Sequence, residues 1–140
     1  MSYPIRNVRR RIHDDYAGVV AEIDRCADAV ADAREAVEPN DREPPRDGLR
    51  AALEATGVLA TLPEVLAAAV DAAGEELRAR PVPAPPYVVV TSRGPMLRAT
   101  IDSGRLVIRF DVFEVVREPS AGSPPSYRRL EGVRLTISLE

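Results

Sequence analysis

A change in the spacing of apolar residues at the proline-rich segment 81–86 constrains the fold more than any other feature of the sequence. Before this segment, apolar residues recur every three or four positions, which is the spacing of one helix face. After it, they alternate with polar residues, as in strands that bury one face. The segment itself is stiff and extended because of its prolines. The sequence therefore predicts an α+β protein in which helices precede an antiparallel β-meander.

Three helices are predicted in the N-terminal part of the chain. The first is long, because its apolar residues follow steps of three and four over more than four heptads. The third is expected to begin with a capping box, in which the Thr61 hydroxyl and the Glu64 carboxylate satisfy backbone amides. The expected helix ranges are 4–38, 47–57 and 61–80.

Four strands are predicted in the C-terminal part, with ranges 87–92, 96–102, 105–118 and 127–139. A two-residue hairpin loop at Ser103 and Gly104 would pair apolar residues on one face and place Arg98 opposite Arg109 on the other. Gly132 is a candidate for a β-bulge. The second and third helices are expected to cover the apolar face. Its predicted residues are Leu97, Ala99, Ile101, Leu106, Ile108, Phe110, Val112, Val133, Leu135, Ile137 and Leu139.

The expected organisation is one domain. It comprises a helical segment at 1–80, the proline-rich connector at 81–86 and the meander at 87–140. Polar loops rich in proline are expected at 38–46 and 119–126. A chain of 140 residues with 45% hydrophobic residues can bury a sizeable core without disulfides or metal.

Composition excludes several classes of protein. All 19 basic residues are arginine, and 22 residues are acidic, which leaves a net charge of −3. Because residues 1–80 carry most of the negative charge, nucleic acid is not the expected partner. No metal-ligand spacing, cofactor motif, signal peptide or membrane-spanning stretch is found, so no cofactor and a cytoplasmic location are expected.

Arginines on the outer sheet face are the first candidate site. Arg98, Arg109 and Arg134 are expected to project from this face, where they can hold a phosphate, an acidic peptide or a nucleic-acid backbone. The alternative is a solvated face whose charge nearby carboxylates balance. The turn from Thr91 to Pro95 adds Arg93, two hydroxyls and backbone amides, which can bind a small anion or simply form a turn.

The apolar seam of the first helix is the second candidate site. Ile12, Val19, Ile23 and Val30 lie on it, and a narrow seam of this kind can pair with a second copy of the chain. The alternative is that it packs against the other helices of its own subunit.

No catalytic constellation emerges from the sequence. His13 lies beside two aspartates, but adjacent residues of a helix point in different directions. Cys26 falls on the apolar stripe, which indicates a buried structural thiol. An enzymatic function is therefore not expected.

The chain resembles a group of small uncharacterised proteins from halophilic archaea, above all in the segments Arg80–Thr91 and Gly94–Thr100. The resemblance implies a cytoplasmic protein in a salt-adapted host. It implies no known activity and identifies no functional residues. From the residues, we expect a non-enzymatic interaction or regulatory protein that binds a protein partner or itself. The alternative is a module that binds a small anion or nucleic acid through its outer arginines.

Overall fold

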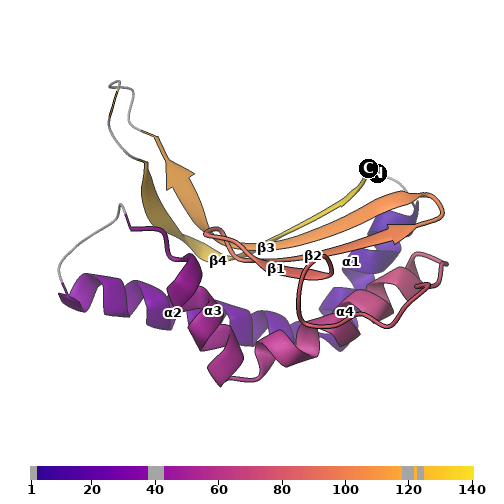
Figure 1. The fold of residues 1–140 in the computed structure, drawn as a ribbon, viewed down its shortest axis with the longest axis horizontal. Coiled ribbons are helices and arrows are strands. Elements are labelled where there is room, and N and C mark those ends of the chain that lie inside the picture. Colours follow the sequence, from indigo (N-terminus) through magenta and orange to yellow (C-terminus); the bar gives the residue numbers. More distant parts are fainter. Residues whose placement is uncertain (1–2, 38–42, 118–121, 123–124) are drawn as a thin grey trace.

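Four helices and then four strands follow one another in residues 3–37, 43–117, 122 and 125–140, which the computed structural model describes (Figure 1). The helices are α1 (Tyr3–Asp15), α2 (Ala17–Val37), α3 (Arg46–Ala55) and α4 (Val58–Ala72). The strands are β1 (Val88–Val90), β2 (Pro95–Ile101), β3 (Gly104–Val116) and β4 (Ser126–Leu139). The α+β class and the order of helices before strands are confirmed. The loops predicted at 38–46 and 119–126 lie largely outside the described residues.

The prediction of three helices with a long first one is wrong in detail. The range 4–38 is divided at Tyr16 into α1 with 13 residues and α2 with 21 residues. Backbone hydrogen bonds continue across the break, from Tyr16 N to Ile12 O and from Val20 N to Tyr16 O. The break lets α1 pack on α4 and β4 while α2 packs on α3, β3 and β4. Gly18, a poor helix former, is the second residue of α2.

The predicted capping box is also wrong. Helix α4 begins at Val58, directly after Gly57, whose φ of 81° is in the left-handed region. Thr61 therefore lies inside the helix, and its hydroxyl donates to Gly57 O at 3.1 Å. Pro63 is the sixth residue of the helix, so its missing amide leaves Leu59 O without the usual intrahelical donor.

The sheet is a meander with the strand order β1-β2-β3-β4, and every neighbouring pair is antiparallel. The register of the β2–β3 hairpin differs from the predicted one by two residues: Arg98 lies opposite Val107, and Arg109 lies opposite Met96. The loop consists of Asp102 and Ser103, since Gly104 already pairs with Ile101. Gly104 fits this strand position because a Cβ there would approach Glu140 O to 2.3 Å.

The helices cover one face of the sheet and leave the other open (Figure 1). All four helices contact strands, not only those predicted to do so. The predicted inward-facing residues are buried or partly buried against the core. No single helix of the described residues is long and apolar enough to cross a membrane, and only α3 and α4 taken together, at 88° to each other, meet that length and composition.

A wide bulge interrupts the β3–β4 ladder, where residues 130–133 of β4 lie opposite the single residue Val112 of β3. Gly132, the predicted bulge residue, has a φ of 80°. The guanidinium of Arg129 fills the bulge: its Nη1 donates to Leu130 O at 2.7 Å, Gly132 O at 3.0 Å and Val112 O at 3.2 Å. This one group thus replaces the ladder hydrogen bonds that the bulge removes.

The same guanidinium joins the bulge to helix α2. Its Nη2 donates to Asp24 O at 3.1 Å, forms an ion pair with the Asp24 carboxylate and lies 3.2 Å from Asp28 Oδ1. The Arg129 side chain is only 17% exposed, so these contacts are poorly screened by water. Arg129 therefore connects the helical layer to the sheet through polar contacts.

The β1–β2 turn is held against β3. Arg93 O accepts hydrogen bonds from Val112 N at 2.7 Å and Phe113 N at 3.0 Å. Gly94 has a φ of 151°, and a Cβ there would lie 1.9 Å from Phe110 O. Only glycine allows this close approach of two backbones.

Replacing Gly94 with alanine is expected to lower the free energy of unfolding by at least about 2 kcal/mol, because the methyl group would force the turn away from β3. Urea denaturation followed by circular dichroism measures the change. Gly18→Ala is the matched control, since a Cβ at Gly18 meets nothing within 4 Å and should leave stability equal or up to about 1 kcal/mol higher. A Gly94→Ala protein as stable as the wild type would contradict this account.

Arg129→Leu is expected to lower the free energy of unfolding by about 2–4 kcal/mol, because the bulge carbonyls and the Asp24 carboxylate would lose their donor. Arg129→Lys should restore only part of this, since an ammonium lacks the planar fork. The neighbouring Arg128 pairs with Glu114 at the surface, so Arg128→Ala should cost less than about 1 kcal/mol. Equal losses for Arg129→Leu and Arg128→Ala in urea denaturation would show that Arg129 has no special role.

Candidate functional site

The sheet face opposite the helices, called the outer face below, is the candidate site. In Figure 1 no described element lies over it. Alternation along the strands places polar side chains on this face, because the apolar ones point to the helices. Its residues are Met96, Arg98 and Thr100 of β2, Arg105, Val107, Arg109 and Asp111 of β3, and Arg134, Thr136 and Ser138 of β4.

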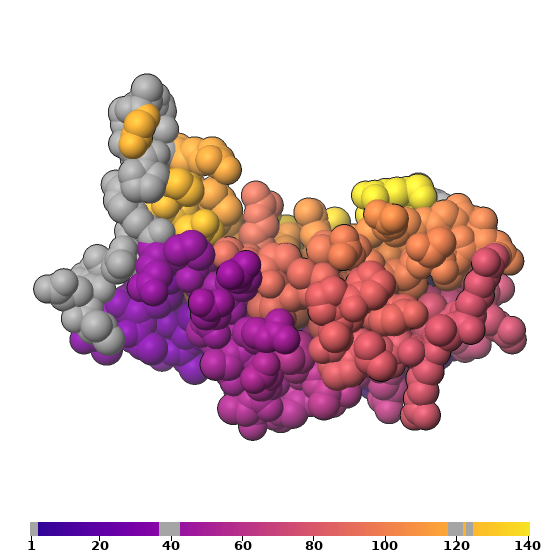
Figure 2. All heavy atoms as spheres, viewed as in Figure 1, coloured from indigo at the N-terminus to yellow at the C-terminus, as the bar shows by residue number. Residues whose placement is uncertain are grey.

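A central hollow of about 350 Å³ lies on the outer face. Arginines of two strands line it together with hydroxyl groups of β4, and Met96 and Val107 contribute apolar surface. Beyond the bulge, residues 113–116 of β3 pair with residues 126–129 of β4 and form what is called the β3–β4 arm below. In Figure 2 the upper profile of the molecule dips between this raised arm and the opposite end of the sheet. The polar residues that line the hollow are Arg98, Arg105, Arg109, Thr136, Ser138 and Glu140.

A second hollow, of about 280 Å³, adjoins the first and shares Met96 and Arg109 with it. It lies between the β1–β2 turn and the β3–β4 arm, and Arg93, Val115 and Tyr127 contribute to its lining. The structure thus brings Arg93 and Arg109, both predicted site residues, to one hollow. The two hollows together form a continuous depression across the outer face.

Two backbone amides of the β1–β2 turn, where the sequence suggested an anion site, already have a partner within the turn. The amides of Arg93 and Gly94 donate to the Thr91 hydroxyl at 3.1 Å and 3.3 Å, and that hydroxyl donates to Gly94 O at 2.9 Å. Thr91 therefore closes the turn on itself, and the Arg93 guanidinium is the charged group that the turn presents.

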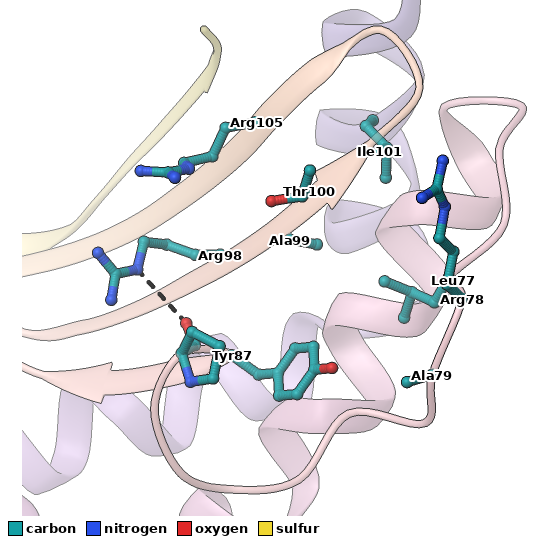
Figure 3. A pocket seen from close by; sticks show the side chains of 10 residues that line it. Leu77, Arg78, Ala79, Tyr87, Arg98, Ala99, Thr100, Ile101 and Arg105 are labelled. Carbon is teal, nitrogen blue, oxygen red and sulfur yellow. Dashed lines mark hydrogen bonds between the residues drawn. The ribbon is translucent and has the colours of Figure 1, made fainter.

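A third hollow, of about 410 Å³, lies at the side of the sheet between β2 and the segment after α4. Figure 3 shows the guanidinium groups of Arg98 and Arg105 extending in the same direction from neighbouring strands, while Arg78 lies on the opposite side of the hollow and extends in another direction. Arg98 Nε donates to Pro86 O at 3.4 Å, and Arg78 is paired with Asp102 at 3.3 Å. Arg98 and Arg105 line both this hollow and the central one.

In the described residues, some arginines have carboxylate partners and others do not. Ion pairs join arginines to carboxylates on the helices, between α1 and α4, and on the β3–β4 arm. On the outer face the contact is weak: Arg109 Nη2 lies 3.9 Å from Asp111 Oδ2. The Asp111 side chain in this contact is buried. The other acidic residue near these arginines is Glu140, which lies opposite Arg105. Arg98 and Arg105 have no carboxylate within 4.0 Å in the described part of the chain.

The predicted arginines are only partly gathered. Arg98 and Arg109 line the central hollow as diagonal neighbours, whereas the sequence placed them directly opposite. Arg134 is on the same face but lies opposite Asp111, on the side of Thr136 nearer the bulge, and does not line the central hollow. Arg105 was missed, because the predicted register paired it with Asp102 at the hairpin tip. In the structure Arg105 lies between Thr100 and Glu140.

The seam of the first helix faces the chain's own core. Ile12 and Ile23 are fully buried, Val30 is 9% exposed, and Val19 packs against the same core. The structure thus places these side chains in the intramolecular packing that the sequence left open as the alternative.

The remaining reactive side chains are isolated. His13 is exposed near the end of α1, and Cys26 is buried with its sulfur 3.5 Å from the Thr56 hydroxyl. Within residues 3–37, 43–117, 122 and 125–140, no cluster of three or more His, Cys, Asp or Glu side chains could hold a metal ion. The chemistry on the outer face is thus that of guanidinium and hydroxyl groups.

Comparison with known proteins places the chain in a family but does not assign an activity. No match to it was found among curated proteins or among solved structures. The sequence profile of one family, described as a domain of unknown function, matches residues 6–140 and therefore covers all of the helices and strands except the first turn of α1. The chain belongs to the DUF7988 family.

Proposed function

We propose that the chain is a non-enzymatic binding protein whose outer face docks an acidic segment of a partner protein. The observation that carries this proposal is the set of arginines on the one sheet face that no described element covers, with Arg98 and Arg105 lacking carboxylate partners. Guanidinium groups in this arrangement suit carboxylates, which they bind through charge-assisted and often bidentate hydrogen bonds.

The shape of the outer face favours a macromolecule over a small anion. Sites for small molecules are usually concave enough to bury most of the ligand surface. The hollows on the outer face are open to solvent and adjoin one another through Met96 and Arg109. An extended acidic segment can contact Arg93, Arg98 and Arg105 at once, whereas a single phosphate cannot.

Nucleic acid is the alternative ligand, because it is negatively charged like an acidic protein segment. Two observations weigh against it. The net charge of −3 repels a polyanion at long range. Stacking platforms are also sparse, with Tyr127 the aromatic residue that lines the hollows between the β1–β2 turn and β4.

A cytoplasmic location of the protein and a salt-adapted host are part of the proposal. The absence of lysine and the excess of acidic residues support it, as does the resemblance to proteins of halophilic archaea. In molar salt the Debye length falls to about 3 Å, so long-range attraction is lost and only direct guanidinium–carboxylate contacts persist. Binding through closely placed arginines is compatible with such conditions.

Arg98→Ala combined with Arg105→Ala is expected to weaken binding of a fluorescein-labelled poly-glutamate peptide by about tenfold or more, because two charge-assisted contacts are lost. Fluorescence anisotropy over a series of KCl concentrations measures the affinity. Arg10→Ala combined with Arg80→Ala is the matched control, since both residues are exposed, lie off the outer face and change the net charge equally.

The outcomes separate the alternatives. Weaker binding in the outer-face variant alone supports the proposal. Equal weakening in both variants would mean that net charge rather than the outer face governs binding, and no binding by the wild type would refute the proposal. Tighter binding of single-stranded DNA than of poly-glutamate through Arg98 and Arg105 would favour the nucleic-acid alternative, and competition by inorganic phosphate would favour a small anion.

A further inference from the structure

Strand β4 forms a long edge of the sheet, whereas the opposite edge strand, β1, has only three residues. Arg105 and Glu140 exchange both backbone hydrogen bonds at 2.9 Å, so they are a hydrogen-bonded pair of the β3–β4 ladder, and every second pair along the ladder is of the same kind. Ser138 and Thr136 therefore direct their backbone groups to β3, and Leu135, Ile137 and Leu139 direct theirs to the open edge. Such an edge can pair with another strand.

The sequence of this edge is complementary to itself in one register. If Ile137 lies on a twofold axis, Leu135 faces Leu139 of the second copy on the helical side of the sheet. On the outer face, Thr136 faces Ser138 of the second copy, and Arg134 faces Glu140 of the second copy. Every cross-strand pair then joins two apolar side chains, two hydroxyls or two opposite charges, and each type of pair stabilises an antiparallel sheet.

Ile137 itself is buried, but the side chains that flank it at this edge have room for a partner. Leu135 and Leu139 pack against the core yet stay partly exposed, and Arg134 and Glu140 are exposed. Arg134 has no carboxylate within 4.0 Å in the described residues, so a second copy would supply one. Arg9 of α1 donates to Leu135 O at 3.0 Å, and a carbonyl oxygen can accept a second hydrogen bond beside it.

We propose that the chain forms a homodimer in which the β4 strands of two copies pair antiparallel about Ile137. The two sheets then form one continuous sheet. Because the twofold axis is perpendicular to that sheet, the outer faces of both copies lie on the same side. Dimerisation itself needs no ligand, so its test is independent of the proposed binding function.

Sedimentation equilibrium is expected to give twice the mass of 15.2 kDa for the wild type. Glu140→Arg should weaken self-association by about tenfold or more, since both symmetry-related pairs become repulsive. Arg134→Glu combined with Glu140→Arg should restore the dimer by exchanging the charges. Thermal melting of each variant separates dissociation from unfolding, because Asp111 and Arg105 lie beside the altered positions.

A cysteine pair tests the register without changing charge. Thr136→Cys combined with Ser138→Cys should give a disulfide-linked dimer on a non-reducing gel, because opposite residues of a non-hydrogen-bonded pair have Cα atoms about 4.5 Å apart. Thr136→Cys alone should not cross-link, since residue 136 faces residue 138 of the second copy. A monomeric wild type, or a dimer that neither the charge exchange nor the cysteine pair affects, would overturn the proposal.

Discussion

The guanidinium of Arg129 holds the two layers of the protein together at the point where the sheet is least regular. A bulge in which residues 130–133 face Val112 leaves carbonyl groups without ladder partners. Arg129 donates to these carbonyls and at the same time to Asp24 of α2. The apolar core alone would pack helices on the sheet without specifying this alignment, whereas directional hydrogen bonds require one position of α2.

The bulge also shapes the candidate site. Beyond it the β3–β4 arm bends away from the helices, and its residues Val115 and Tyr127 form one wall of a hollow on the outer face (Figure 1). The opposite wall is the β1–β2 turn, which Gly94 allows to approach β3 closely. Two backbone irregularities thus convert a flat sheet face into a depression lined with arginine.

Much of the fold can be predicted from the sequence because the relevant signals are local. The alternation of Leu97, Ala99 and Ile101 identifies a strand and its buried face, and it fixes which side of the sheet Arg98 occupies. It does not fix the hairpin register, because a shift of two residues preserves every facing. For this reason the sequence predicts the correct face for Arg98 and Arg109 but not their cross-strand partners, and it does not identify Arg105 as a site residue.

Spacings within one segment are enough to predict the class of most elements, the division into a helical and a sheet half, and the composition of the two sheet faces. The break at Tyr16, the burial of the Ile12–Val30 seam and the role of Arg129 cannot be predicted in this way. Each of these depends on contacts between segments far apart in the chain: Arg129 meets Asp24, and the seam meets the sheet. An arginine in a strand has the same local pattern whether it reaches solvent or a buried bulge, and only packing distinguishes the two.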